Sequence, residues 1–157
     1  MKNVNFINLI DLLNTYPEQI EIIKEQYLLL LSELTLTTYI ETPLFLKNIE
    51  RINQMGSIII GYIGSPLDNN FEIVVSGTII IEPKIIRGGK NVGHIEDIIV
   101  SKIMRKKGLA QEILNMLKTI ARENNCYKVS LNCKDDIKKV YMKNGLKVKE
   151  IQMCEYF

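Results

Sequence analysis

The apolar residues of this chain recur with two spacings, about two and about 3.6 residues, which are typical of strands and helices respectively. Residues 4–8 alternate between apolar and polar side chains and predict a short strand. Residues 17–34 and 42–55 each place apolar side chains on one helical face, with Pro17 and Pro43 at their first turns, and predict two helices. Gly56 is positioned to end the second helix.

The rest of the chain alternates between strand and helix patterns. Residues 57–63 and 71–82 predict a hairpin around a loop rich in turn residues, and residues 95–101 predict a buried strand. The pattern then predicts a helix after Gly108, a strand over residues 127–133, a short helix over 135–144 and a final strand over 146–156. The order β-α-α-β-β-β-α-β-α-β indicates an α/β or α+β fold with a mixed sheet, in a single domain spanning residues 1–157.

Composition narrows the possible roles. The chain has 157 residues, of which 46% are hydrophobic and 24% are charged, as is typical of a soluble globular domain. Its net charge of +2 gives no argument for nucleic acid as a partner. Cys126, Cys133 and Cys154 lack the spacing of metal ligands, so we expect no metal and a reducing compartment. No apolar run is long enough for a membrane span and no signal peptide is evident, so we expect a cytoplasmic protein.

Two adjacent carboxylates, Glu96 and Asp97, interrupt the buried strand at residues 95–101. Charged residues are rarely buried without a partner, so this conflict points to a functional site. On a regular strand the two side chains face opposite sides, and a bulge is needed to direct both to one pocket. The alternative is that one carboxylate pairs with a nearby lysine.

A cationic loop, Arg105-Lys106-Lys107-Gly108, precedes the third long helix. The N-terminal end of a helix is already positive, so cations there favour a bound anion such as a phosphate. Gly108 lets an anion approach the backbone. A solvated basic turn is the equally weighted alternative.

Arg105-x-x-Gly108-x-Ala110 between a strand and a helix resembles the acyl-CoA pyrophosphate loop of the GCN5-related N-acetyltransferase (GNAT) superfamily. Three further blocks resemble the members of that superfamily that acetylate an amino-sugar phosphate. They are Gly93-His94-Ile95-Glu96-Asp97-Ile98, then Cys126-Tyr127-Lys128-Val129 with Asn132-Cys133, and Val140-Tyr141-x-Lys143-x-Gly145. The resemblance is strong over residues 80–153 and weak before residue 35.

The resemblance implies the GNAT fold, with a mixed central sheet flanked by helices and a central strand that splays from its neighbour where acetyl-CoA enters. It implies Tyr141 as the acid for the departing thiolate, and Glu96 and Asp97 as groups that contact the amino sugar and position its amine. The implied acetyl-CoA ligands are Ile98, Ile99, Val100, Arg105, Lys106, Lys107, Gly108, Leu109, Ala110, Tyr141 and Lys143. The implied sugar-phosphate ligands are Thr35, Lys84, Arg87, Glu96, Asp97, Lys128 and Asn132.

Each of these residues also has a purely structural interpretation. Tyr141 suits packing of a helix on the sheet, and the lysines suit a solvated surface. His94 is the only histidine, and its place before the carboxylates favours a structural role over that of a base.

Three positions depart from the pattern of these relatives. Asn132 stands where an acidic residue is usual, Ile137 where a cofactor-binding Asn is common, and Met153-Cys154-Glu155-Tyr156 lacks an arginine expected to meet the phosphate. We therefore keep three hypotheses: an acetyltransferase for an amino-sugar phosphate, an acetyltransferase for another amine such as a protein N-terminus or polyamine, and a non-catalytic acyl-CoA-binding module. The resemblance also implies a homodimer with the C-terminal strand near the partner.

Overall fold

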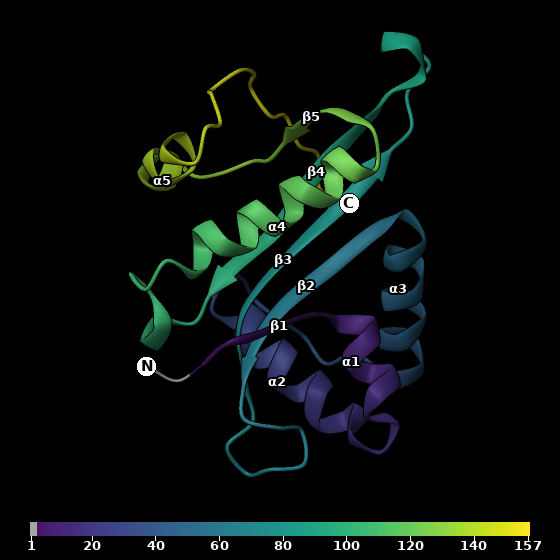
Figure 1. Ribbon diagram of the computed structural model, residues 1–157, viewed down its shortest axis with the longest axis vertical. Helices are drawn as coiled ribbons and strands as arrows, with labels where there is room; N and C mark the ends of the chain where they lie inside the picture. Colours follow the sequence, from purple (N-terminus) through teal and green to yellow (C-terminus); the bar gives the residue numbers. More distant parts are fainter. Residues whose placement is uncertain (1–2) are drawn as a thin grey trace.

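A computed structural model describes residues 3–157 and contains a five-stranded mixed sheet (Figure 1). The strands are β1 (Asn5–Asn8), β2 (Gly56–Ile63), β3 (Glu72–Glu82), β4 (Asn91–Val100) and β5 (Cys126–Ser130), and they lie in this order across the sheet. Neighbouring strands are antiparallel except β4 and β5, which are parallel. Because parallel neighbours need a crossover, α4 (Leu109–Glu123) runs between them. The predicted mixed sheet is therefore confirmed.

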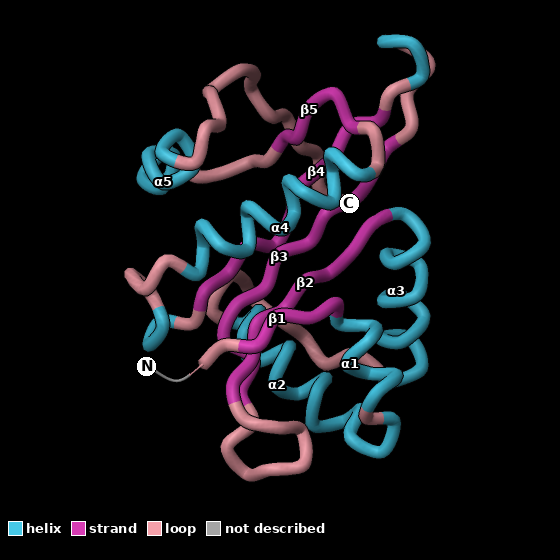
Figure 2. The backbone as a smooth tube through the Cα atoms, in the orientation of Figure 1, coloured by secondary structure: helices cyan, strands magenta, loops and turns pink. Residues whose placement is uncertain are grey.

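Three helices precede β2 and pack on one face of the sheet (Figure 2). They are α1 (Leu9–Thr15), α2 (Ile20–Ser32) and α3 (Thr42–Met55). Their buried apolar side chains join those of Ile58, Ile60, Ile73 and Ile99 in one core cluster. Alternate residues on the same strands, such as Ile59 and Ile98, pack on the opposite face, as the two-residue period requires.

Helix α4 covers that opposite face and lies very close to the sheet (Figure 1). Two glycines face it. A Cβ on Gly77 would lie 2.9 Å from Leu117 Cδ1 and 3.2 Å from Ile113 Cγ1, and a Cβ on Gly93 would lie 3.4 Å from Ala121 Cβ. The missing side chains thus allow the close approach of α4.

The sequence prediction missed α1. Two helices were predicted before the second strand, whereas the structure has three. Asn8 caps α1, since its Oδ1 accepts a hydrogen bond from the Ile10 N–H at 3.3 Å. Leu9, Leu12 and Leu13 are buried at helical spacing, but a helix of seven residues is too short to give a clear period.

The predicted final strand is wrong. After α5 (Lys138–Lys143) residues 146–157 form no strand, and Val148, Ile151 and Met153 are 72%, 92% and 92% exposed. An alternating pattern identifies a segment able to form a strand, but it does not supply the neighbouring strand that the segment needs. No helix within residues 3–157 is both long and apolar enough to cross a membrane.

Candidate active site

Strand β4 separates from β5 halfway along its length. The ladder between them ends at the pair His94–Ser130, so residues 95–100 of β4 have no partner on β5. This is the splay that the family resemblance implied. It leaves backbone groups of β4 free on the β5 side, and unpaired N–H groups are strong donors for a ligand.

Strand β4 also bulges against β3. Pairing passes from Thr78–Glu96 to Ser76–Ile99, which places one extra residue on β4. Asp97 lies in the bulge and has a φ of 51°. Aspartate tolerates this left-handed conformation better than most residues do. The bulge required for both carboxylates to serve one pocket is therefore present.

A cleft of about 1110 Å³ opens where β4 and β5 separate. Its walls are the second half of β4, the loop before α4 together with the first turn of that helix, and residues 132–144 with α5. Most predicted site residues line it, namely Glu96, Asp97, Ile98, Ile99, Val100, Arg105, Lys106, Gly108, Leu109, Ala110, Asn132, Tyr141 and Lys143.

The loop at the N-terminal end of α4 combines left-handed backbone with cationic side chains. Lys106 and Gly108 have φ of 62° and 83°, and nothing lies within 4 Å of a Cβ built on Gly108. Backbone in alternating conformations directs neighbouring N–H groups to one point. Arg105 and Lys106 line the cleft beside them, so the residues present suit a diphosphate. Lys107 is different, because its Nζ donates to Met104 Sδ at 3.2 Å and it does not line the cleft.

The two carboxylates hold their protons more tightly than usual. Burial among the cleft walls raises the pKa of Asp97 and of Glu96, and the charge of Asp97 raises that of Glu96 further, while His94 opposes the shift. Below the bulge, burial raises the pKa of Tyr27 to about 12, so this phenol stays protonated. No group of three His, Cys, Asp or Glu side chains within residues 3–157 is arranged to hold a metal.

Both ring nitrogens of His94 have a hydrogen-bonding partner. Its Nε2 lies 2.6 Å from Glu82 Oε2 and its Nδ1 lies 3.3 Å from Ser130 Oγ. Glu82 also pairs with Lys84. These contacts join β3, β4 and β5, which supports the structural role predicted for His94.

Tyr141 on α5 lines the cleft and packs against the core cluster below α4. Burial raises the pKa of its phenol, and the nearby Cys133 adds to the shift. A phenol with a raised pKa is fully protonated at neutral pH, as a general acid must be.

Five predicted residues lie outside the cleft lining. Besides Lys107, Thr35 follows the lining residue Leu34, and Lys84, Arg87 and Lys128 gather at the other end of β4. There the Arg87 and Lys128 cations lie 5.5 and 5.9 Å from the centre of the Tyr127 ring. The single chain does not bring these cations to the carboxylate pair.

The sequence analysis missed several residues of the cleft. Glu33, Leu34, Met104, Cys133, Asn144 and Gln152 all line it. Glu33 and Leu34 follow α2, far from β4 in sequence, and no motif or spacing connects them to the site. Only the packing of α2 on the sheet places them there.

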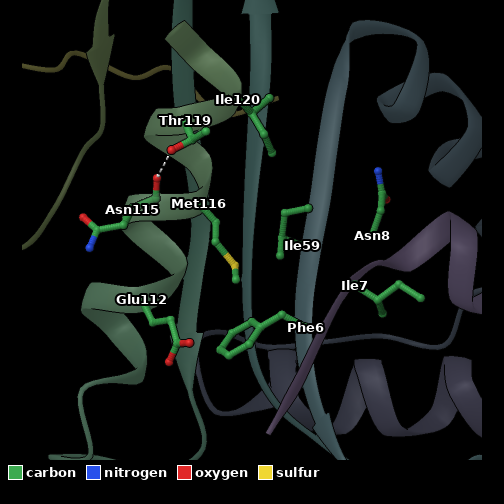
Figure 3. A pocket seen from close by; sticks show the side chains of 9 residues that line it. All are labelled: Phe6, Ile7, Asn8, Ile59, Glu112, Asn115, Met116, Thr119 and Ile120. Atoms are coloured by element: carbon green, nitrogen blue, oxygen red, sulfur yellow. Dashed lines mark hydrogen bonds between the residues drawn. The ribbon is translucent and has the colours of Figure 1, made fainter. Parts of the chain in front are cut away.

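A second, smaller cavity of about 440 Å³ lies between α4 and the strands β1 and β2 (Figure 3). Phe6, Ile59 and Met116 give it apolar walls, and the Thr119 hydroxyl donates to the Asn115 carbonyl at 3.0 Å on its rim. It lacks the combination of carboxylates, cations and free strand backbone found in the larger cleft.

The sequence profile of the acetyltransferase (GNAT) family matches residues 9–145. The chain therefore belongs to this family, which confirms the resemblance and the predicted fold.

Among individual proteins, the chain is similar to glucosamine 6-phosphate N-acetyltransferase of Arabidopsis thaliana, with 31% identity over 134 residues, covering 85% of this chain and 89% of that protein. The crystal structure of an Arabidopsis thaliana enzyme of this name superposes with a TM-score of 0.83 and 27% identity over 99% of both chains. A probable glucosamine 6-phosphate N-acetyltransferase 2 of Oryza sativa subsp. japonica is 40% identical over 85 residues, covering 54% of this chain and 51% of the rice protein. The match to the rice protein thus spans about half of that protein's length.

Proposed function

We propose that this chain is a single-domain, acetyl-CoA-dependent N-acetyltransferase whose acceptor is the amine of glucosamine 6-phosphate. The observation that supports this proposal most directly is the cleft itself. The splayed half of β4, the cationic loop, the carboxylate pair and Tyr141 all line one space of about 1110 Å³. The relatives named above carry the name of an enzyme for this acceptor, one of them as a probable enzyme. The product, N-acetylglucosamine 6-phosphate, is a precursor for UDP-N-acetylglucosamine synthesis.

The donor end of the cleft is the loop before α4. Arg105, Lys106 and the backbone N–H groups around Gly108 suit the diphosphate of coenzyme A. The unpaired backbone of Ile98, Ile99 and Val100 suits the amide groups of the pantetheine arm, and Lys143 adds a cation on the α5 wall. Acetyl-CoA supplies the thioester.

The acceptor amine attacks the thioester carbon directly, and no covalent enzyme intermediate is needed. A new C–N bond forms, the C–S bond breaks, and the thiolate takes a proton from the Tyr141 hydroxyl. The amine nitrogen loses one proton to solvent, and the Tyr141 phenolate regains a proton from solvent, so the enzyme returns to its starting state. Free N–H groups of β4 stabilise the oxyanion of the tetrahedral intermediate. Glu96 and Asp97 position the amine, and Asn132 on the facing wall adds a hydrogen-bonding amide.

We infer a cytoplasmic homodimer as the working form. The C-terminal segment exposes apolar side chains, those of Val148, Ile151, Met153 and Tyr156. Exposed apolar surface of this kind is typical of a site that a partner subunit covers. A dimer also offers a way to bring Lys84, Arg87 or Lys128 of one subunit to the sugar phosphate in the other. Thr35 beside the cleft is the proposed hydroxyl contact.

Release of free coenzyme A thiol tests the proposal. Purified protein with acetyl-CoA is expected to release thiol on addition of glucosamine 6-phosphate and to do so poorly with glucosamine, which lacks the phosphate. Equal release with many amines would support a different acceptor. Binding of acetyl-CoA without release by any amine would support the non-catalytic module.

A further inference from the structure

Glu33 has two electrostatically unfavourable neighbours. It follows the last residue of α2 and acts as its C-cap, where the helix end is partly negative. It also lines the cleft beside the proposed diphosphate loop, where a carboxylate repels a bound diphosphate. A carboxylate in such a place needs a compensating contact.

The loop after β4 provides that contact. Glu33 Oε2 accepts a hydrogen bond from the Lys102 backbone N–H at 2.9 Å and lies 3.7 Å from Arg105 Nη2. Lys102 opens a single 3-10 turn (Lys102–Met104), and its N-cap residue Ser101 provides no side-chain hydrogen bond to that turn. Glu33 therefore supplies from α2 the acceptor that the turn lacks locally.

Glu33 is the first residue of the segment that joins α2 to α3. We call residues 33–41 the acceptor strap, because Leu34 lines the cleft and Thr35 follows it. The far end of the strap is fixed by Lys24, which is only 3% exposed. Its Nζ lies 2.7 Å from Glu21 Oε2, 2.5 Å from Thr42 Oγ1 and 5.4 Å from the centre of the Tyr39 ring. The strap is thus held at one end by Lys24 and at the other by Glu33.

We propose that Glu33 is a positioning residue that docks the acceptor strap against the cofactor loop and so couples the two halves of the site. This inference rests on the proposed function for the identity of the acceptor. The Lys102 N–H holds the strap, and Arg105 is shared between Glu33 and the incoming diphosphate. The same carboxylate therefore strengthens acceptor binding and weakens coenzyme A binding.

Two substitutions separate these effects, and one serves as their control. Glu33→Gln keeps an oxygen that accepts the Lys102 N–H but removes the charge, whereas Glu33→Ala removes both. Glu25→Gln makes the same change of net charge at an exposed position on α2. Amide hydrogen exchange of Lys102 and the strap, coenzyme A affinity at low and high salt, and acceptor KM and kcat are measured for all three.

In Glu33→Ala we expect exchange at Lys102 to be about tenfold faster and the acceptor KM to rise about tenfold with kcat nearly unchanged, as loss of a charge-assisted hydrogen bond implies. In Glu33→Gln both should change less than about threefold. Both Glu33 variants should bind coenzyme A about threefold more tightly at low salt, and the gain should disappear at high salt.

Exchange at Lys102 and an acceptor KM that both match those of Glu25→Gln would overturn the inference. Exchange at Lys102 needs no substrate, so the docking contact is tested even if glucosamine 6-phosphate is not the acceptor. Unchanged exchange at Lys102 in Glu33→Ala, with an active wild-type enzyme, would reject the docking role alone. Faster exchange in Glu33→Ala, with no acetyl transfer to glucosamine 6-phosphate by the wild type, would reject the proposed function alone.

Discussion

Gly77 of β3 and Asp97 of β4 are both passed over by the ladder between their strands, which pairs Ser76 with Ile99 and Thr78 with Glu96. Gly77 faces α4, where a Cβ would lie 2.9 Å from Leu117 Cδ1, and Asp97 has the left-handed backbone of the bulge. The irregular pairing of β3 with β4 thus occurs where α4 packs closely on one face of the sheet and where β4 borders the cleft.

Replacing Gly77 with alanine should destabilise the fold. The new Cβ would lie 2.9 Å from Leu117 Cδ1, so α4 or its side chains must move away from the sheet. Overpacking of this kind costs about 1–3 kcal/mol. The free energy of unfolding, measured by urea titration, should fall by that amount, and an unchanged midpoint would mean that Leu117 adjusts freely.

Replacing Asp97 with asparagine should change how stability depends on pH. The folded protein raises the pKa of Asp97 through burial, so the protonated carboxyl stabilises the fold and that contribution is lost as pH rises through the raised value. Asparagine tolerates the left-handed backbone but does not titrate. The variant should therefore gain stability relative to the wild type between the unfolded pKa of about 4 and neutral pH.

Urea midpoints of both proteins across this pH range measure the effect. A stability difference that stays constant with pH would contradict the prediction. Loss of acetyl transfer in the same variant, with its fold intact, is expected if Asp97 positions the amine.

Tyr141→Phe should lower turnover far more than it lowers acetyl-CoA affinity. The ring still packs on the core, but the proton for the thiolate is lost, and general acids contribute about 100-fold or more to rate. Steady-state kcat and direct acetyl-CoA binding are the two measurements. Tyr16→Phe, in the layer of α1 and α2, is the matched control and should behave like the wild type. Unchanged turnover in Tyr141→Phe would remove Tyr141 from the acid role.

Lys106→Ala should weaken coenzyme A binding, and the loss should shrink at high salt because salt screens charges of this kind. Lys107→Ala is expected to have the smaller effect, since its ammonium donates to Met104 Sδ and Lys107 itself does not line the cleft. Calorimetric titrations at two salt concentrations compare the two variants. Equal affinity of Lys106→Ala and wild type at all salt concentrations would refute the phosphate-loop assignment.

Much of this architecture is predictable because local chemistry and global packing agree. The apolar face of α4, the left-handed Gly108 before it and the β-branched residues of β4 all indicate their structures directly. The motif around Glu96 and Asp97 pointed to the candidate site, because charge on a buried strand conflicts with its surroundings, and both residues line the cleft.

Other features depend on contacts that the sequence does not encode locally. Glu33 joins the site only because α2 packs beside the loop after β4, and its contact to Lys102 spans 69 residues. The segment after α5 has a strand-like pattern at Ile151 and Met153, yet both side chains are exposed and the segment pairs with no strand of the sheet within residues 3–157. A strand needs a neighbouring strand, and the pattern of the segment itself does not encode one. Lys107 looked equivalent to Lys106 in sequence, and only the path of the loop separates them.

The two sides of the cleft are built very differently. On one side, α4 packs closely over Gly77 and Gly93, and its Leu114 and Leu117 are fully buried. On the other side, no residue of α5 is buried. The α4 wall is thus anchored by fully buried side chains, whereas the α5 wall contacts the core through the partly buried Tyr141. Because few buried contacts hold the α5 wall, we expect substitutions where α5 meets the core to change the rate of coenzyme A release more than they change the affinity of the loop at Gly108 for the diphosphate.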